Sequence, residues 1–139
     1  EKVTGTVIVD EKYEQGLSDL DGFSHVILLY LFHRSSGYDL MVQPFLDDTP
    51  RGLFSTRAPR RPNPIGLSIV KLIKVAKNTI KIEGIDVLNN TPLIDIKPYV
   101  PRFDIKRENG EDRVRAGWLE KKQALADTQK SDFRFVSQE

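Results

Sequence analysis

The segment from Arg51 to Leu67, R-G-L-F-S-T-R-A-P-R-R-P-N-P-I-G-L, most constrains what this chain can fold into. Its prolines at 59, 62 and 64 fix φ and remove backbone donors, so it can be neither a helix interior nor a central strand. It also contains four arginines, at 51, 57, 60 and 61. A stiff loop holds guanidinium groups at low entropic cost, and these groups suit carboxylates and phosphates. The segment predicts an anion-binding loop, and the alternative is a solvated surface loop.

Most of the remaining sequence consists of short β-branched and aromatic segments separated by turn signals such as Asp21-Gly22 and Lys77-Asn78. We expect strands over residues 3–9, 23–33, 40–45, 53–56, 68–75, 79–86 and 91–100, with a hairpin between 68–75 and 79–86. This pattern predicts a mainly β fold, an antiparallel sheet closed or nearly closed into a barrel. We expect a turn or short helix over 10–19, with Leu17 and Leu20 facing inward, and a helix over 118–129.

Alternation predicts the faces of two strands. The segment 23–33 is apolar on both faces, which is typical of a central buried strand. One of its faces would carry Val26, Leu28, Tyr30 and Phe32, and the other His25, Ile27, Leu29, Leu31 and His33. In 91–100, one face would carry Leu93, Asp95, Lys97 and Tyr99, and the other Ile94 and Ile96.

Composition indicates a single globular domain of 139 residues and excludes several classes of site. There is no cysteine and there are only two histidines, so we expect no metal. The longest apolar run, 26–32, is too short to span a bilayer, and without a signal-peptide pattern we expect a cytoplasmic protein. The net charge of +1 conceals eight basic and no acidic residues between 49 and 82. This asymmetry predicts one face that binds an anionic partner. The alternative is that the basic residues only form the solvent-exposed face of a hairpin.

Familiar catalytic motifs are absent. Without G-x-S-x-G, we expect no nucleophile elbow of the kind found in hydrolases. Without G-x-G, we expect neither a Rossmann site nor a phosphate-binding loop. Asp86 and Asp95 are candidate functional carboxylates, because Asp95 and Lys97 share one face of a largely apolar strand. Asp95 is either functional or part of a structural ion pair with an arginine. His33 and Arg34 end the apolar strand, where side chains reach a rim.

Four ordered motifs carry a resemblance to a known family. They are L-S-D-L-D-G-F-S-H (17–25), L-F-H-R (31–34), G-L-F-S-T-R-A-P-R-R-P-N-P-I-G-L-S (52–68) and G-I-D-V-L-N-N-T-P-L-I-D-I-K-P-Y-V-P (84–101). In this order they resemble the TrmO family, also called YaeB-like or TsaA-like, over roughly residues 3–104. The family's members are tRNA N6-threonylcarbamoyladenosine methyltransferases. The family's opening strand and proline-rich loop, around I-G-x-I-x-S-P and P-x-Q-P, have no counterpart in this sequence, and we expect the native start to lie upstream.

The resemblance implies a single-sheeted antiparallel β-barrel over residues 1–104, followed by a C-terminal extension, 105–139, with a short helix. It also implies a homodimer that binds S-adenosyl-L-methionine near its interface and methylates threonylcarbamoyladenosine beside the tRNA anticodon. Carried over by motif, the cofactor contacts are His33, Arg34, Arg57, Leu67, Gly84, Ile85 and Asp86. The expected tRNA contacts are Arg60, Arg61, Asn63, Lys97 and Tyr99, and Asp95 is the candidate general base.

Two other functions stay open on the sequence. One is a non-catalytic RNA-binding β-barrel module that retains the basic loop. The other is a structural or regulatory dimer that binds no nucleic acid.

Overall fold

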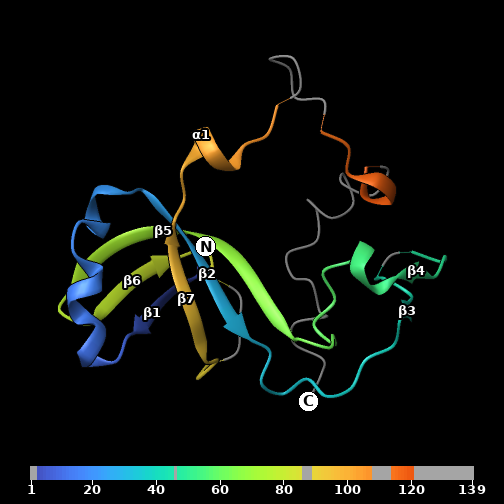
Figure 1. Ribbon diagram of the computed structural model, residues 1–139, viewed down its shortest axis with the longest axis horizontal. Coiled ribbons are helices and arrows are strands. Elements are labelled where there is room, and N and C mark those ends of the chain that lie inside the picture. Colours follow the sequence, from blue (N-terminus) through green and yellow to red (C-terminus); the bar gives the residue numbers. More distant parts are fainter. Residues whose placement is uncertain (1–2, 46, 86–88, 108–113, 121–139) are drawn as a thin grey trace.

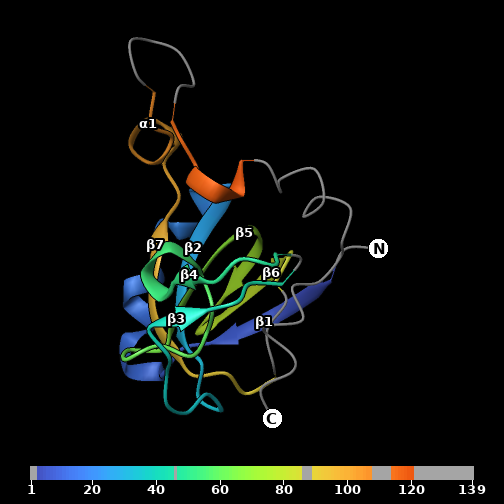
Figure 2. The same ribbon diagram turned by 90° about the vertical axis from the view of Figure 1, so that its right-hand side faces the viewer.

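The structure, a computed structural model, describes residues 3–45, 47–85, 89–107 and 114–120. Its main element is a five-stranded antiparallel sheet with the strand order β1-β6-β5-β2-β7 (Figure 1). The five strands are β1 (Thr4–Ile8), β2 (His25–Leu31), β5 (Ile65–Ala76), β6 (Thr79–Glu83) and β7 (Leu93–Pro98). The strands β3 (Met41–Val42) and β4 (Arg51–Gly52) pair separately, and Figure 2 shows this pair in front of the sheet. The mainly antiparallel β prediction is confirmed.

The core lies on the inner face of the sheet. Val26, Leu28 and Tyr30 of β2 share one buried face, as the sequence predicts, but the residues between them are partly exposed, whereas the sequence predicts burial on both faces. The core is completed by Val70, Leu72, Ile80 and Ile82 from β5 and β6, and by Leu17 and Leu20. Those two leucines belong to the 3-10 helices η1 (Glu11–Leu17) and η2 (Leu20–Gly22). The predicted short helix with two inward leucines is therefore confirmed.

β5 gives the sheet its curvature. The first part of this twelve-residue strand pairs with β2 and its last part pairs with β6, with a register shift between Leu72 and Lys74. The predicted hairpin between β5 and β6 is present, and Lys77 supplies a positive φ of 53° in its turn. The side chain of Asn78 donates to the carbonyl of Val9 at 2.8 Å, which ties the hairpin to the segment after β1.

The predicted alternation over 91–100 is wrong in its first half. Asp95 pairs with Leu29 and Leu93 pairs with Tyr30, so a bulge leaves Ile94 as an extra residue. Leu93 consequently packs against the core, on the same side as Ile96, rather than sharing a face with Asp95. Every residue beyond a bulge points to the opposite face of the sheet from the one that simple alternation predicts. The sequence pattern contains no sign of this bulge.

Residues 53–56 do not form the predicted strand. Leu53–Ser55 is the 3-10 helix η3, and Thr56 ends it with its Oγ1 donating to the carbonyl of Leu53 at 2.7 Å. Two more short helices follow the sheet: α1 (Pro101–Asp104) and the 3-10 helix η4 (Gly117–Leu119). Most of the helix expected over 118–129 lies outside the described residues.

The described strands do not close into the predicted barrel. β1 and β7 are the two edges of the sheet, and each pairs on one side only in the described part of the chain. A cavity of about 550 Å³ lies between these edges, lined by residues 3–8, 89–93 and core side chains such as Leu28 and Ile82. None of the helices that the structure describes is long and apolar enough to cross a membrane.

Candidate functional site

We refer to residues 51–67 as the arginine–proline loop. Arg61 holds its first turn together, because its Nη1 donates to the carbonyls of Leu53, Thr56 and Ala58 at 3.4, 2.9 and 3.1 Å. The guanidinium carbon also lies 5.7 Å from the centre of the Phe54 ring. These contacts within the loop explain why the segment turns into η3 instead of extending, since they satisfy carbonyls that a strand would direct to a neighbour.

Arg60 connects the loop to the segment after β2. Its Nε donates to the carbonyl of Ser36 at 3.2 Å, and its Nη1 lies 3.4 Å from the carboxylate of Asp39. Both partners of this ion pair are exposed, so the pair adds little stability and exchanges readily for another anion.

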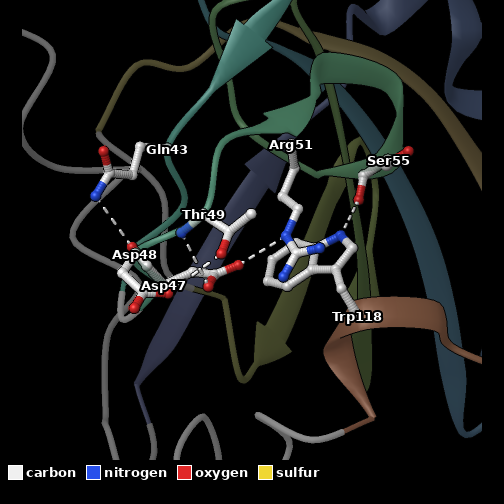
Figure 3. A network of polar contacts seen from close by, with 7 residues as sticks. All are labelled: Gln43, Asp47, Asp48, Thr49, Arg51, Ser55 and Trp118. Carbon is white, nitrogen blue, oxygen red and sulfur yellow. Dashed lines mark hydrogen bonds and ion pairs between the residues drawn. The ribbon is translucent and has the colours of Figure 1, made fainter.

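Arg51 forms a tighter pair, seen in Figure 3. Its Nε lies 2.9 Å from Oδ2 of Asp47, whose side chain is only 2% exposed. The backbone N–H of Thr49 also donates to Asp47, at 3.3 Å. On its other side the Arg51 guanidinium faces the indole of Trp118, 5.3 Å from the ring centre, and the indole Nε1 donates to the carbonyl of Ser55 at 2.8 Å.

Arg57 differs from the other three arginines of the loop. Its side chain is exposed, and it makes no hydrogen bond or ion pair within the described part of the chain. It directly follows Ser55 and Thr56, the turn that Arg61 and Trp118 hold. Among the residues that the structure describes, Arg57 is therefore the one arginine of the loop with a free guanidinium, and Arg61 holds the turn before it.

The predicted cofactor residues His33 and Arg34 lie where three segments meet. The N–H of Phe32 donates to the carbonyl of Pro64 at 2.7 Å, and the N–H of Leu31 to that of Pro92 at 2.9 Å. The end of β2 therefore adjoins the starts of β5 and β7. His33, Arg34 and Asn63 are exposed at this junction.

Leu67 lies on the outer face of the sheet, beside the candidate base. Leu29 pairs with Leu67 on one side and with Asp95 on the other, which sets the three side chains in one row. In this row the Asp95 carboxylate lies 2.8 Å from the Lys97 ammonium, and the N–H of Ile96 donates to it. The hydrogen bond from Lys97 lowers the pKa of Asp95 below its ordinary value. The structure thus contains the ion pair that the sequence left open, with a lysine in place of an arginine.

Two of the predicted tRNA contacts lie away from the arginines. Tyr99 packs edge-on against His25 at 6.2 Å, at the start of β2, and Lys97 is in the adjoining row. The loop joins the sheet at the other end of β2, six residue steps from His25, which is about 20 Å at roughly 3.3 Å per step. Arg60, Arg61 and Asn63 therefore lie together, and Lys97 and Tyr99 form a separate group.

Gly84 and Ile85 lie near the β1 edge. Gly84 has a φ of 96°, no atom lies within 4 Å of where its Cβ would be, and its N–H donates to the carbonyl of Val3 at 2.8 Å. Ile85 lines the cavity between β1 and β7. Asp86, the remaining predicted cofactor residue, lies outside the described residues. Across the part of the chain that the structure describes, no three acidic or histidine side chains gather as metal ligands.

Sequence reasoning missed two features of the site. The first is an outer apolar face on β2 and β5, made of Ile27, Leu29, Leu31, Ile65, Leu67 and Ile69. The apolar character of 23–33 on both faces is its signal, but this pattern also predicts burial of both faces. The second is the contact of Trp118 with the loop, which no local pattern indicates because 63 residues separate Trp118 from Ser55.

Comparisons with known proteins agree with the resemblance. The profile of the tRNA-methyltransferase O N-terminal domain matches residues 1–105. A Pyrococcus abyssi protein named "Probable S-adenosyl-L-methionine-binding protein" is 47% identical over 97% of this chain and 71% of its own length. A Rattus norvegicus tRNA (adenine(37)-N6)-methyltransferase is 45% identical over 66% of this chain and 22% of its own length.

A solved structure has the same fold. The crystal structure of TrmO from Pseudomonas aeruginosa superimposes with a TM-score of 0.62 at 32% identity, over 97% of this chain and 64% of that one. The chain thus spans about two thirds of the length of this solved relative and less than a quarter of the rat protein. The match of the domain profile to three quarters of the sequence, together with these relatives, shows that the chain belongs to the TrmO family of tRNA methyltransferases.

Proposed function

We propose that this chain is an S-adenosyl-L-methionine-dependent methyltransferase that acts on N6 of adenosine 37 in tRNA. Family membership supports the class of reaction, and relatives carry the names of tRNA methyltransferases and S-adenosyl-L-methionine-binding proteins. The observation in the chain itself that carries the proposal is Arg57, whose exposed guanidinium makes no hydrogen bond or ion pair within the described part of the chain and lies on a basic loop. We further propose that the substrate adenosine carries a threonylcarbamoyl group, whose carboxylate is the kind of anion that an arginine binds.

The residues present fit the cofactor. Arg57 has its donors available for the methionine carboxylate, and the exposed Leu67 offers an aliphatic surface for the adenosine ring. The open, left-handed Gly84 lets a ligand approach the backbone closely. His33, Arg34, Ile85 and Asp86 complete the proposed set. When bound, S-adenosyl-L-methionine supplies an activated methyl group, and the residues of this chain contribute by binding and aligning the two reactants.

Asp95 is proposed as the group that accepts the proton of N6. Its lowered pKa keeps it ionised at neutral pH and therefore able to accept a proton, although it is a weak base for the same reason. Its ion pair with Lys97 is half exposed, so a substrate can displace the lysine at small cost.

The tRNA contacts divide into two groups. Arg60 is proposed to exchange its weak pair with Asp39 for a phosphate, while Arg61 and Asn63 contact tRNA beside it. Lys97 and Tyr99 would meet a different part of the anticodon arm, since they lie toward the other end of β2. The partly exposed ring of Tyr99 suits stacking of a splayed base.

A homodimer is also proposed. The outer apolar face supports it, because an antiparallel sheet with one solvated face normally alternates apolar and polar residues.

The barrel stays a prediction as well. Within the described residues β1 and β7 each pair on one side only, and the cavity between them has both apolar and polar lining; one or more added strands would close this arrangement. The cytoplasmic location and the division at residue 104 stay predictions.

The test is S-adenosyl-L-methionine binding by calorimetry, combined with transfer of a labelled methyl group to tRNA with and without threonylcarbamoyladenosine. We expect binding and transfer by the chain, loss of both in Arg57→Ala, and no change in Arg102→Ala, a control arginine that is also exposed. Cofactor binding together with methyl transfer to tRNA that lacks threonylcarbamoyladenosine would support the methyltransferase activity. It would reject threonylcarbamoyladenosine as the required substrate. Binding of tRNA without cofactor binding would favour the RNA-binding module instead.

A further inference from the structure

We propose that Trp118 is a positioning residue, and that the segment 114–120 acts as a strap which holds the arginine–proline loop in the conformation that presents Arg57. Trp118 lies beyond residues 1–105, the part matched by the domain profile, so this function belongs to the chain's C-terminal extension. The proposed consequence for ligand binding rests on the function proposed above.

Trp118 makes two contacts with the loop through different parts of its indole (Figure 3). The ring Nε1 donates to the carbonyl of Ser55 at 2.8 Å, and the ring face lies 5.3 Å from the guanidinium carbon of Arg51. The first contact fixes the backbone and the second fixes a side chain. Both contacts come from η4, which Figures 1 and 2 show beside the β3–β4 pair.

The chain of contacts continues into buried structure. The same Arg51 guanidinium is paired at 2.9 Å with Asp47, whose side chain is 2% exposed. Asp47 in turn accepts the N–H of Thr49, and its carbonyl accepts from the side chain of Gln43 at 3.3 Å. Trp118 is therefore linked through Arg51 to an anchored carboxylate, and its position is well defined.

The loop needs such a strap because its regular structure is minimal. β3 and β4 have two residues each, and an isolated hairpin of this kind is marginally stable in water. η3 is a single 3-10 turn, and no side-chain hydrogen bond caps its start. Ser55, the residue that accepts from Trp118, ends η3 two positions before Arg57. Loss of the strap would therefore release the turn from which Arg57 projects.

The first measurement tests the strap without any ligand. Trp118 is the only tryptophan, so its fluorescence reports its own surroundings. We expect Arg51→Ala to shift the emission maximum to longer wavelength, and Phe103→Ala, a control at an exposed aromatic of α1, to leave it unchanged. In hydrogen exchange, Trp118→Ala should raise the exchange of amides in 51–58 severalfold and leave β5 and β6 protected. Unchanged exchange in 51–58 would overturn the proposal.

The second measurement separates positioning from stability. With S-adenosyl-L-methionine and tRNA as probes, Trp118→Ala should raise both KM values about five- to tenfold and leave kcat within a factor of two. Trp118→Phe, which keeps the ring but lacks the donor to Ser55, should give an intermediate KM. A fall in kcat with unchanged KM would reject a positioning role. Failure of the unaltered chain to bind either probe would refute the proposed function alone, since the exchange result tests the strap independently.

Discussion

At the scale of single residues, the arginine–proline loop shows that arginine has two uses. Arg51, Arg60 and Arg61 donate to the protein's own carboxylates and carbonyls, whereas Arg57 makes no such bond to any residue that the structure describes. The sequence predicted a stiff anion-binding loop from its prolines and arginines. It could not separate the two uses, because the partners of Arg51 and Arg60 include side chains and carbonyls that become neighbours only after folding, such as Ser36 and Trp118.

This division predicts opposite effects for two neighbouring substitutions. Arg61→Ala removes the donor to three carbonyls, and we expect it to lower the free energy of unfolding by about 1–3 kcal/mol. Arg57→Ala should change it by less than about 0.5 kcal/mol, because that side chain is exposed and unpaired in the described structure, yet it should abolish cofactor binding. Urea denaturation and calorimetry on the same samples measure both.

Arg61→Lys is the matched variant for the first effect. It keeps the charge but cannot reproduce the planar fork that reaches several carbonyls, so it should be nearly as unstable as Arg61→Ala. Full rescue by lysine would mean that charge, and not hydrogen-bond geometry, holds the turn.

Asp95 carries a prediction about pH. Its pKa is lowered chiefly by the hydrogen bond from Lys97, so the stabilisation from this pair is present above the ordinary carboxyl pKa and disappears as pH falls through the lower, folded value. Asp95→Asn should therefore match the unaltered chain in stability under strongly acidic conditions and be slightly less stable at neutral pH. The difference should be small, since the pair is half exposed. In assays, Asp95→Asn should lower kcat and leave cofactor affinity unchanged, whereas an unchanged kcat would leave Asp95 with a structural role only.

At the scale of elements, the sequence predicts which side chains of a strand face the core wherever every second residue does so. The alternation of β2 and the inward leucines of η1 and η2 follow from the sequence pattern. The bulge in β7 and the turn at η3 did not follow from it, because Tyr30 and Leu29 of β2 determine the first and Arg61 the second. Strand pairing with residues distant in sequence overrides local propensity at the bulge, and a side chain eight residues beyond Leu53 does so at η3.

Gly66 gives an element-scale prediction for β5. A Cβ at this position would lie 2.3 Å from the ring of Tyr30 and 2.8 Å from that of Phe32, which themselves pack edge-on. Gly66→Ala should therefore force β5 away from β2 and destabilise the fold by about 1–3 kcal/mol, as overpacking of a core does. Gly22→Ala is the control, because nothing lies within 4 Å of its added methyl group. Equal melting temperatures for the two variants would show that the rings move aside without cost.

At the scale of the whole molecule, the sequence predicted one mainly β unit but not its open edges. Closure of the sheet depends on whether β1 and β7 pair with further strands, and no sequence pattern within either strand indicates such pairing. The outer apolar face presents a similar difficulty. Residues such as Ile27 and Ile69 are equally compatible with burial under a layer of the same chain and with burial against another molecule.

The proposed homodimer gives the last prediction. The outer apolar face spans two central strands and has the Asp95–Lys97 pair along one side, a neutral and self-complementary edge that suits an isologous contact. Ile69→Glu places a charge on this face, in the row beside Leu29 and Leu67, where Ile69 is 49% exposed. We expect the variant to be monomeric by light scattering at concentrations at which the unaltered chain is dimeric. Ile105→Glu, at a similarly exposed isoleucine after α1, should remain dimeric.

Salt distinguishes this contact from tRNA binding. Association through apolar side chains should persist, or strengthen, between 50 mM and 500 mM salt, because it releases few counterions; tRNA affinity should fall steeply over the same roughly tenfold range. A dimer that dissociates with salt, or that survives Ile69→Glu, would place the interface elsewhere on the molecule.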